Sequence, residues 1–429
     1  MKVVVAHNRY RSAQPSGENM IVEQEIAELR AVGVEVLPFL RDSDDIARMS
    51  PAARVLLPAS PVYNRSAQRE LSALLTVHRP DVLHLHNPYP LLSPWVVRTA
   101  HRHGVPVVQT VHNYRHVCSP GLYYRDGHVC QDCRGRLLRL PGVVHGCYRG
   151  SRAQSAVMAA ALAVHRPTWR SVDRYLALTS AIAAHLGEYG IPAERIVVKP
   201  NSVPDPGPPG GPGTGFLFLG RLTPEKGLDL LLAAWRRHPD GALGPLRIAG
   251  DGPQRPLAEA AAAEREDVTF LGPLPRARVL AELRATAVVV VPSILHDVLP
   301  TVAIEALAHG RPVLGTALGG IPYVAGTDEP TARADERGPA PGAGPPPGPP
   351  AARPAETPRA GPAGWTVVPD PAALAAALPV AHAAAPALGP TARSRYERHF
   401  HPEVITRRLL DVYADLASAA GPPTGPAPG

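Results

Sequence analysis

The chain has 429 residues, of which 45% are hydrophobic and 19% charged, and it carries a formal charge of +7. Its length is typical of two or three domains, and its apolar fraction suffices for sizeable cores. A small disulfide scaffold, a fibre and a wholly disordered chain are therefore excluded. The basic residues are scattered and form no long run, so no nucleic-acid partner is expected.

Short apolar runs alternate with longer helical patterns along the first half of the chain. Strands are expected at 3–6, 34–39, 82–86, 105–110 and 175–179, with helices such as 18–32 and 94–102 between them. This alternation is typical of βαβ units, which build a parallel sheet covered by helices on both faces. The pattern predicts a doubly wound α/β domain over residues 1–203.

The same pattern begins again after residues 204–213, which are all Pro or Gly apart from Asp205 and which we interpret as a linker. Strands are expected at 216–220, 246–249, 268–271, 287–291 and 313–316, and helices at 228–237, 275–285 and 301–309. A second doubly wound domain is thus predicted over 214–418. Ligands in such sheets bind beyond the carboxyl ends of the strands, so the two domains are expected to face each other across a cleft.

A low-complexity segment interrupts the second domain. Residues 326–364 hold 11 of the 52 prolines, and proline disfavours both helices and central strands, so we expect a disordered surface insertion there. The pattern resumes at 365–368 with a strand, followed by a helix near 371–378 and one or two helices over 393–417. Residues 419–429 are expected to form a disordered tail.

We expect no stretch of the sequence to approach the 18 uncharged apolar residues of a membrane span, and the apolar run at 3–6 is too short for the core of a signal peptide. We therefore expect no transmembrane segment and a cytoplasmic location. Peripheral contact with a membrane surface is compatible with this sequence.

Two motifs of the second domain follow strands and carry ionic side chains. Gly-Arg-Leu-Thr-Pro-Glu-Lys-Gly at 220–227 contains Arg221 and Lys226, and an arginine fork beside a lysine point charge suits a diphosphate. Farther along, Asp297 lies in a loop that leads into a helix beginning near Thr301 and Val302. The free amides of a helix start can hold phosphate oxygens.

Glu305 lies one turn into that helix and is expected to face the same ligand. Carboxylates accept hydrogen bonds from the hydroxyls of sugar and ribose. The site would thus hold a diphosphate flanked by polyols, which describes a nucleotide sugar. As an alternative, each of these charges could be a solvated surface group.

The first domain offers its own candidates. Gly17 opens a helix, and its small size could let backbone amides approach a phosphate. His112 follows the strand at 105–110, where a lone histidine is otherwise an ordinary loop residue. His84 and His86 lie at period two on one strand, and we interpret this pair as structural.

In combination these motifs resemble those of the retaining glycosyltransferases of family 4, which have the GT-B fold, over residues 1–325 and 364–415. The resemblance is carried by Gly-Arg-x3-Glu-Lys-Gly, by an acidic pair separated by seven residues, and by Gly319-Gly320 after the next strand. It implies that Asp297 and Glu305 bind the donor sugar and the nucleotide ribose. It also implies that Arg221 and Lys226 neutralise the donor diphosphate.

The same resemblance implies that His112 contacts the donor sugar and that the Gly17 loop lies near the diphosphate. The chain departs from the family where Asp297 replaces a glutamate, where Tyr323 stands in place of a frequent glutamate, and where Ser16 replaces a frequent glycine. The shorter Asp297 bears on the identity of the donor sugar.

The implied activity is transfer of a sugar, with retention, from a nucleotide sugar to an acceptor hydroxyl, without a catalytic metal. UDP-N-acetylglucosamine or a UDP-hexose is the favoured donor. The favoured acceptor is a small natural-product precursor such as the aminocyclitol of an aminoglycoside antibiotic; a lipid-linked glycan or a phospholipid for cell-surface polysaccharide is the alternative. A nucleotide-sugar epimerase and a non-catalytic GT-B module stay open, because fold alone does not fix function.

The four cysteines form a separate group. Cys118, Cys130, Cys133 and Cys147 are spaced C-x11-C-x2-C-x13-C, and no other cysteine occurs. This arrangement could form a tetrahedral structural zinc site, whereas a cytoplasmic location argues against two disulfides. Four unconnected buried thiols are the alternative. We expect a zinc ion that pins the loop 112–150, which could form a wall of the acceptor pocket.

Overall fold

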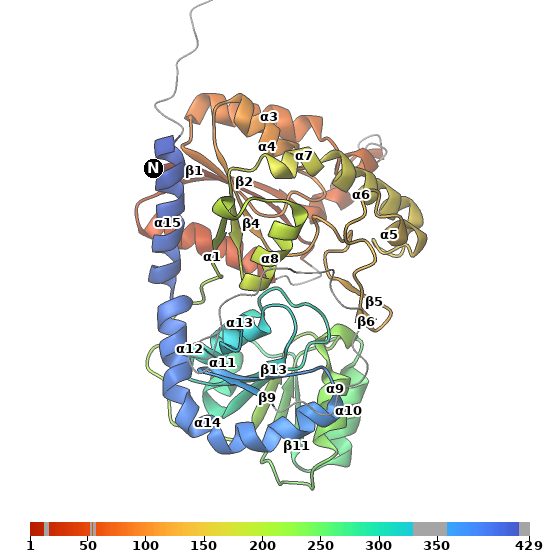
Figure 1. Ribbon diagram of the computed structural model, residues 1–429, viewed down its shortest axis with the longest axis vertical. Coiled ribbons are helices and arrows are strands. Elements are labelled where there is room, and N and C mark those ends of the chain that lie inside the picture. The colour runs from red at the N-terminus through yellow and green to blue at the C-terminus, as the bar shows by residue number, and fades with distance from the viewer. Residues whose placement is uncertain (13–16, 52–53, 55–56, 329–357, 420–429) are drawn as a thin grey trace, which may run out of the picture. The chain divides into compact units, whose positions relative to one another are not determined.

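The computed structural model describes residues 1–12, 17–51, 54, 57–328 and 358–419, and the chain divides into two compact units (Figure 1). Unit 1 comprises Met1–Pro204 and His399–Gly429, and unit 2 comprises Asp205–Arg398. The expected linker 204–213 thus lies almost entirely within unit 2. Each unit is described below by itself.

Unit 1 is built on a parallel sheet with the strand order β2-β1-β3-β4-β7-β8. Its strands are β1 (Lys2–Arg9), β2 (Glu35–Asp42), β3 (Val82–Leu85), β4 (Val107–Val111), β7 (Arg174–Ala177) and β8 (Ile196–Val198). Its helices are α1 (Gly17–Ala31), α3 (Arg65–His78), α4 (Trp95–Arg102), α5 (Leu140–Val144), α6 (Arg152–Val164), α7 (Arg166–Arg170), α8 (Ser180–Tyr189) and α15 (Pro402–Ala419), with short 3-10 turns at Ser43–Arg48, Leu57–Ala59 and Ala193–Arg195. The order reverses between β1 and β3, which is where doubly wound sheets bind ligands.

Unit 2 contains a second sheet with the order β11-β10-β9-β12-β13-β15-β14, parallel except for the antiparallel pair β14 and β15. Its strands are β9 (Phe216–Leu219), β10 (Leu246–Ala249), β11 (Val268–Gly272), β12 (Val288–Val291), β13 (Val313–Thr316), β14 (Arg359–Gly361) and β15 (Gly364–Val367). Its helices are α9 (Leu228–Trp235), α10 (Arg255–Glu264), α11 (Arg276–Ala285), α12 (Thr301–Ala308), α13 (Ile321–Ala325) and α14 (Pro371–His399), with a 3-10 turn at Pro224–Lys226. Here the order reverses between β9 and β12, the two strands that precede the ionic motifs. The expectation of two doubly wound parallel sheets is confirmed.

The C-terminal helix α15 corrects the expected domain boundary. Residues 399–418 were expected to belong with the second domain, but they pack in unit 1. The apolar positions Leu409, Val412, Tyr413 and Leu416 recur at helical spacing and join the core formed by α1 and the strands of that unit. Figure 1 shows α15 beside α1. The apolar periodicity of a helix in the sequence does not indicate which sheet the helix packs against.

The proline-rich insertion was expected over 326–364, and its residues 329–357 lie outside the described part of the chain. For 358–364 the expectation of disorder is wrong, because β14 and the start of β15 lie there. Of the expected tail, Ala419 ends α15 and the following residues are not described.

The helix expected near 371–378 continues to His399 through Pro379, Pro386 and Pro390. These prolines are exposed and recur at helical spacing, so they lie on the face of the helix that points away from the core. The apolar face of α14 packs into the main core of unit 2, including Leu374 and Leu378.

The expectation that no uncharged apolar stretch approaches 18 residues is wrong for 371–392. Among the described residues, the helical stretch Pro371–Ala419 is long and apolar enough to cross a membrane by length and composition, with a mean hydropathy of 1.5 in its most apolar window. That window is 39% buried in the fold.

Candidate functional site

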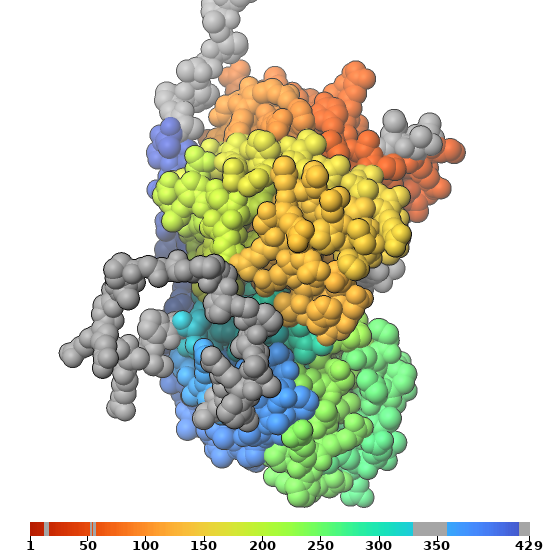
Figure 2. Space-filling model, turned by 45° about the vertical axis from the view of Figure 1, so that its right-hand side comes forward, coloured from red at the N-terminus to blue at the C-terminus, as the bar shows by residue number. Residues whose placement is uncertain are grey.

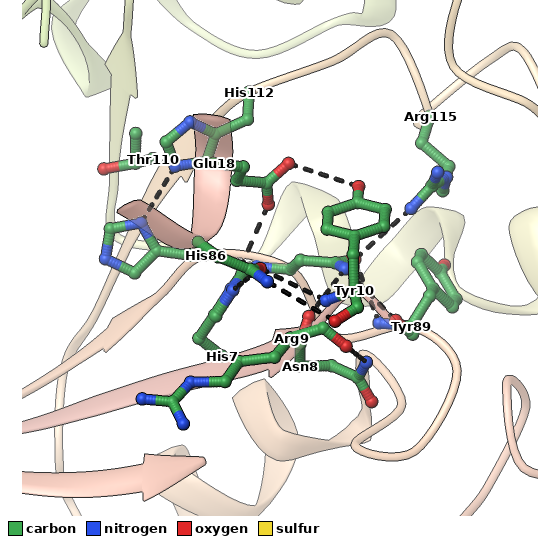
Figure 3. A network of polar contacts seen from close by, with 12 residues as sticks. His7, Asn8, Arg9, Tyr10, Glu18, His86, Tyr89, Thr110, His112 and Arg115 are labelled. Atoms are coloured by element: carbon green, nitrogen blue, oxygen red, sulfur yellow. Dashed lines mark hydrogen bonds and ion pairs between the residues drawn. The ribbon is translucent and has the colours of Figure 1, made fainter. Parts of the chain in front are cut away.

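Polar side chains follow β3 and β4 at the carboxyl edge of the first sheet. His86 comes directly after β3, and His112 directly after β4. Their imidazoles stack, and His86 Nδ1 lies 2.9 Å from His112 Nε2 (Figure 3). The structure thus joins the predicted catalytic histidine to a residue that the sequence analysis treated as merely structural.

Behind His86 lies a buried ion pair that the sequence analysis did not anticipate. Glu25 of α1 places Oε1 3.3 Å from His86 Nε2 and 3.2 Å from His84 Nδ1, while its Oε2 lies 2.6 Å from Lys199 Nζ. Glu25 is 7% exposed and Lys199 is 1% exposed. Burial raises the pKa of Glu25, but Lys199 and the two histidines outweigh it and hold this pKa well below its ordinary value.

This chain of contacts bears on the tautomer of His112. The Glu25 carboxylate lies 3.3 Å from His86 Nε2 and electrostatically favours a proton on that nitrogen. In that tautomer His86 Nδ1 accepts from His112 Nε2, which leaves His112 Nδ1 as an acceptor. Burial, followed by the histidines nearby, holds the pKa of His112 well below its ordinary value, so the ring is neutral near pH 7.

A second group of polar side chains surrounds the start of α1. Glu18 Oε2 accepts a hydrogen bond of 3.2 Å from the Tyr10 hydroxyl, and Glu18 Oε1 lies 4.0 Å from His7 Nδ1 (Figure 3). Burial raises the pKa of Glu18 to about 7, although Arg115 and Tyr10 oppose the rise. Glu18 therefore titrates in the physiological range and was missed by the sequence analysis.

A small cavity of about 20 Å³ is lined by Glu18, His86, His112, Asn113 and Arg115, among others. It offers room on the scale of one water molecule. Gly17, the predicted phosphate contact, opens α1; it is exposed, and a Cβ placed on it would meet no atom of the described residues within 4 Å apart from its chain neighbours. Ser16 lies outside the described residues.

In unit 2, glycines let the two ionic loops pack closely. A side chain on Gly227, which has φ of +75°, would place its Cβ 2.0 Å from the carbonyl oxygen of Pro292. A side chain on Gly319, with φ of +59°, would place its Cβ 2.2 Å from the carbonyl oxygen of Asp297. Only glycine fits such positions, so these residues bring the loops after β9, β12 and β13 together.

The loops that meet there carry the predicted donor residues. Lys226 Nζ forms an ion pair with the Asp297 carboxylate. Arg221 lies in the loop of Lys226, with a side chain 63% exposed and a guanidinium nitrogen 3.5 Å from Glu225. Thr301 and Val302 form the first turn of α12, and within the described residues no side chain caps this turn.

Glu305 lies on the same helix but has a partner that the sequence analysis missed. Its Oε1 accepts a hydrogen bond of 2.7 Å from Arg276, the first residue of α11. Burial raises the pKa of Glu305, and the Arg276 guanidinium opposes this. Arg276 thereby fixes the carboxylate that was predicted to bind ribose.

The site residues that the sequence analysis missed differ in whether the sequence contains a signal for them. Glu25 interrupts the apolar face of α1 between Val22 and Leu29, and an acid at such a position signals a buried charge that needs a partner. Lys199 is one of three lysines in the chain and follows a short apolar strand. For Arg276 and Glu18 the sequence holds no comparable signal, because surface helices commonly begin with charged residues.

Two family models match this chain. One, described as glycosyl transferase 4-like domain, matches residues 16–202, and the other, described as glycosyl transferases group 1, matches residues 213–338. A D-inositol 3-phosphate glycosyltransferase of Gordonia bronchialis is 31% identical over 351 residues, covering 71% of this chain and 70% of that protein. The fold and the family models define a glycosyltransferase with the GT-B fold. More narrowly, the chain belongs to the group 1 glycosyltransferases of family 4.

Other relatives match over shorter lengths. A 2-deoxystreptamine N-acetyl-D-glucosaminyltransferase of Streptomyces fradiae is 32% identical over 207 residues, which are 43% of this chain and 48% of that protein. The match to a D-inositol 3-phosphate glycosyltransferase of Nocardia farcinica spans 38% of that relative. Among solved structures, an Anabaena protein in complex with UDP-glucose has a TM-score of 0.59 and 14% identity, covering 97% of this chain and all of that one, which establishes the fold.

Proposed function

We propose that the protein transfers a sugar, with retention, from a UDP-sugar to a hydroxyl of a cyclitol. The observation that carries the donor half is the pairing of Lys226 with Asp297 beside Arg221 and the uncapped start of α12. Two cations and a helix start in one place form a site for a diphosphate. The complex of the Anabaena protein, which has the same fold, with UDP-glucose supports UDP as the nucleotide of the donor.

On donor binding, Lys226 exchanges partners. Its ammonium leaves the Asp297 carboxylate for a diphosphate oxygen, and Arg221 supplies a second cation as charge develops on the leaving group. Asp297 is then free to accept a hydrogen bond from a sugar hydroxyl. Glu305, held by Arg276, accepts hydrogen bonds from the ribose. UDP-N-acetylglucosamine and UDP-glucose are the donors to test first.

His112 contributes an acceptor atom rather than a charge. Its neutral ring, fixed by His86, presents Nδ1 to a hydroxyl of the donor sugar. A protonated ring would oppose the positive charge that develops on the sugar during transfer, whereas a neutral ring does not.

The acceptor class rests on the relatives. Those considered above are named for D-inositol 3-phosphate and for 2-deoxystreptamine, and both compounds are cyclitols. A hollow of about 310 Å³ in unit 1 is lined by Tyr10, Arg11, Ser43, Arg149 and Gln154. These lining residues, all within the described chain, include two arginines and no carboxylate. They favour a phosphorylated cyclitol over the aminocyclitol expected from the sequence.

The test incubates the purified protein with each of the two UDP-sugars in combination with each of three acceptors: D-inositol 3-phosphate, inositol and 2-deoxystreptamine. Mass spectrometry detects product, and NMR gives its anomeric configuration. An α-linked product is expected, formed far more efficiently with the phosphorylated cyclitol than with inositol and not formed with 2-deoxystreptamine. A product with 2-deoxystreptamine alone would overturn the acceptor class, and a β-linkage would overturn retention. If no UDP-sugar or UDP protects the protein from thermal unfolding, the donor site proposed here is wrong.

A further inference from the structure

The segment 112–150 of unit 1 has little regular structure for its length. Its regular elements within the described chain are the two-residue strands β5 (Tyr124–Arg125) and β6 (His128–Val129) and the five-residue helix α5. Tyr123, Asp126, Arg139 and Arg149 have positive φ, which is costly for residues with a Cβ. Figure 2 shows this segment in orange and yellow on the surface of unit 1. Interactions other than backbone pairing are therefore needed to hold segment 112–150 in this conformation.

All four cysteines of the chain lie in this segment, and each is a free thiol with partial exposure. Tyr123 and Gly142 each connect two of these cysteines. Tyr123 accepts a hydrogen bond from the amide of Cys130, and its own amide points at the sulfur of Cys118. Cys118 and Cys130 are therefore neighbours although eleven residues separate them.

Gly142 joins the other two. Cys133 Sγ lies 3.4 Å from the position of a Cβ on Gly142, and the Gly142 carbonyl accepts a hydrogen bond from the amide of Cys147. Ser119 Oγ lies 3.7 Å from the same Cβ position, which brings the residue after Cys118 to this point as well. The packing around Gly142 thus links both pairs of cysteines.

Hydrogen-bond donors surround two of the sulfurs. Amides of Gly121, Leu122 and Tyr123 point at the sulfur of Cys118, as amides do around metal-bound thiolates, and Arg125 donates to Cys147. Such donors suit sulfurs that carry negative charge, as metal-bound thiolates do.

We infer that Cys118, Cys130, Cys133 and Cys147 bind one Zn²⁺ as a closed, structural tetrathiolate site. Four thiols lose their protons to solvent as the four Zn–S bonds form, and no oxidation takes place. Thiolates select zinc over Mg²⁺ and Ca²⁺, and four protein ligands leave no position for a substrate.

Among the described residues, the ligand atoms of Glu25, His84 and His86 lie within 4.8 Å of one another, a spacing that no three of the cysteine sulfurs share. There Lys199 Nζ already lies 2.6 Å from the Glu25 carboxylate and supplies the positive charge. Thiolates are better zinc ligands than a carboxylate that is already paired with an ammonium, so the cysteines are the better candidate for zinc. Arg149, which lines the proposed acceptor hollow, lies two residues after Cys147, so on the proposed function the zinc also holds a residue of the acceptor site in place.

In the first experiment, elemental mass spectrometry measures the metal content of the full chain, purified without added metal. One zinc per chain is expected, released when a mercurial reagent titrates four thiols. Replacement by Co²⁺ should give the thiolate charge-transfer bands and the intense visible bands of tetrahedral cobalt. A chain that carries no zinc and binds none, or a cobalt complex without thiolate bands, would overturn the inference. Oxidised cysteines with a mass four hydrogens lower would show two disulfides instead.

Variants add a matched comparison. Cys133→Ser should lose most of the zinc, whereas Gln131→Ser, an exposed residue between two of the cysteines, should keep it. If Cys133→Ser fails to fold, the metal measurement and the cobalt titration of the unchanged chain still test whether the cysteines bind zinc. Protection of the protein by UDP is measured in parallel, because the donor residues lie in unit 2 and a failed donor site would leave the zinc result unaffected.

Discussion

His86 Nδ1 lies 2.9 Å from His112 Nε2, and the other ring nitrogen of His86 lies 3.3 Å from the carboxylate of Glu25. His86 thus acts on the proposed reaction through His112, as a positioning residue. Substitution of His86 by Phe should lower kcat roughly 10- to 100-fold, because His112 loses the partner that sets its tautomer. KM for the UDP-sugar should change little, since the nucleotide contacts lie elsewhere.

His84 is the matched control for this variant. It lies on the same strand and also faces Glu25, but its nitrogens contact Tyr413 and Thr110 rather than His112. His84→Phe should therefore lower stability without a selective loss of kcat. His86→Asn, with its side-chain amide, should recover part of the activity of His86→Phe. Equal losses of kcat in stably folded His84 and His86 variants would contradict the positioning role.

The ion pair between Lys199 and Glu25 predicts a strongly non-additive response. Lys199→Met leaves a buried carboxylate without its cation and should cost roughly 3–5 kcal/mol of unfolding free energy. The double variant Lys199→Met/Glu25→Gln removes both charges and should recover a large part of that loss. Urea denaturation of the single and double variants measures the coupling. Additive losses would show that the two charges do not depend on each other.

Glu18 predicts a pH dependence of stability. Its pKa is about 7 in the folded protein and 4.5 ordinarily, so the folded state holds the proton more tightly. This contribution is fully present below pH 4.5 and is lost as the pH rises through 7, about 3 kcal/mol in total. Glu18→Gln should remove that part of the dependence and raise stability at pH 8.

The measurement is the melting temperature of both proteins between pH 5 and pH 8. The difference between Glu18→Gln and the unchanged chain should grow with pH over this range. A difference that stays constant would mean that Glu18 keeps an ordinary pKa.

In unit 2 the contact between Lys226 and Asp297 predicts opposite effects of two substitutions on UDP binding. Lys226→Met removes a charge from the diphosphate and should weaken UDP binding roughly 10- to 100-fold. Asp297→Asn releases Lys226 from its partner and should leave UDP binding equal or stronger, while sugar transfer falls. Isothermal titration with UDP measures both. As a control, Arg236→Met alters an exposed pair with Glu264 and should leave UDP binding unchanged.

These relationships show which parts of the molecule the sequence could predict. The strands and the loops after β9 and β12 were predictable, because hydrophobic runs and glycine-bounded motifs are local features. Tyr413 and His84 are 329 positions apart yet 2.6 Å from each other, and no local pattern indicates that α15 packs in unit 1. The role of His86 likewise depends on Glu25 and Lys199, which are remote in sequence. Tertiary packing determines which residues contact one another in the folded chain, and a single sequence does not show that packing.

Arg149 provides a test of the acceptor class. If it binds a phosphate, Arg149→Met should raise KM for D-inositol 3-phosphate roughly tenfold and leave KM for inositol unchanged. Added salt should raise KM for the phosphorylated acceptor in the unchanged chain and less in the variant, because salt screens the lost attraction. Arg69→Met, an exposed arginine on α3, serves as the control. Equal changes in KM for both acceptors would mean that Arg149 supports the hollow without contacting phosphate.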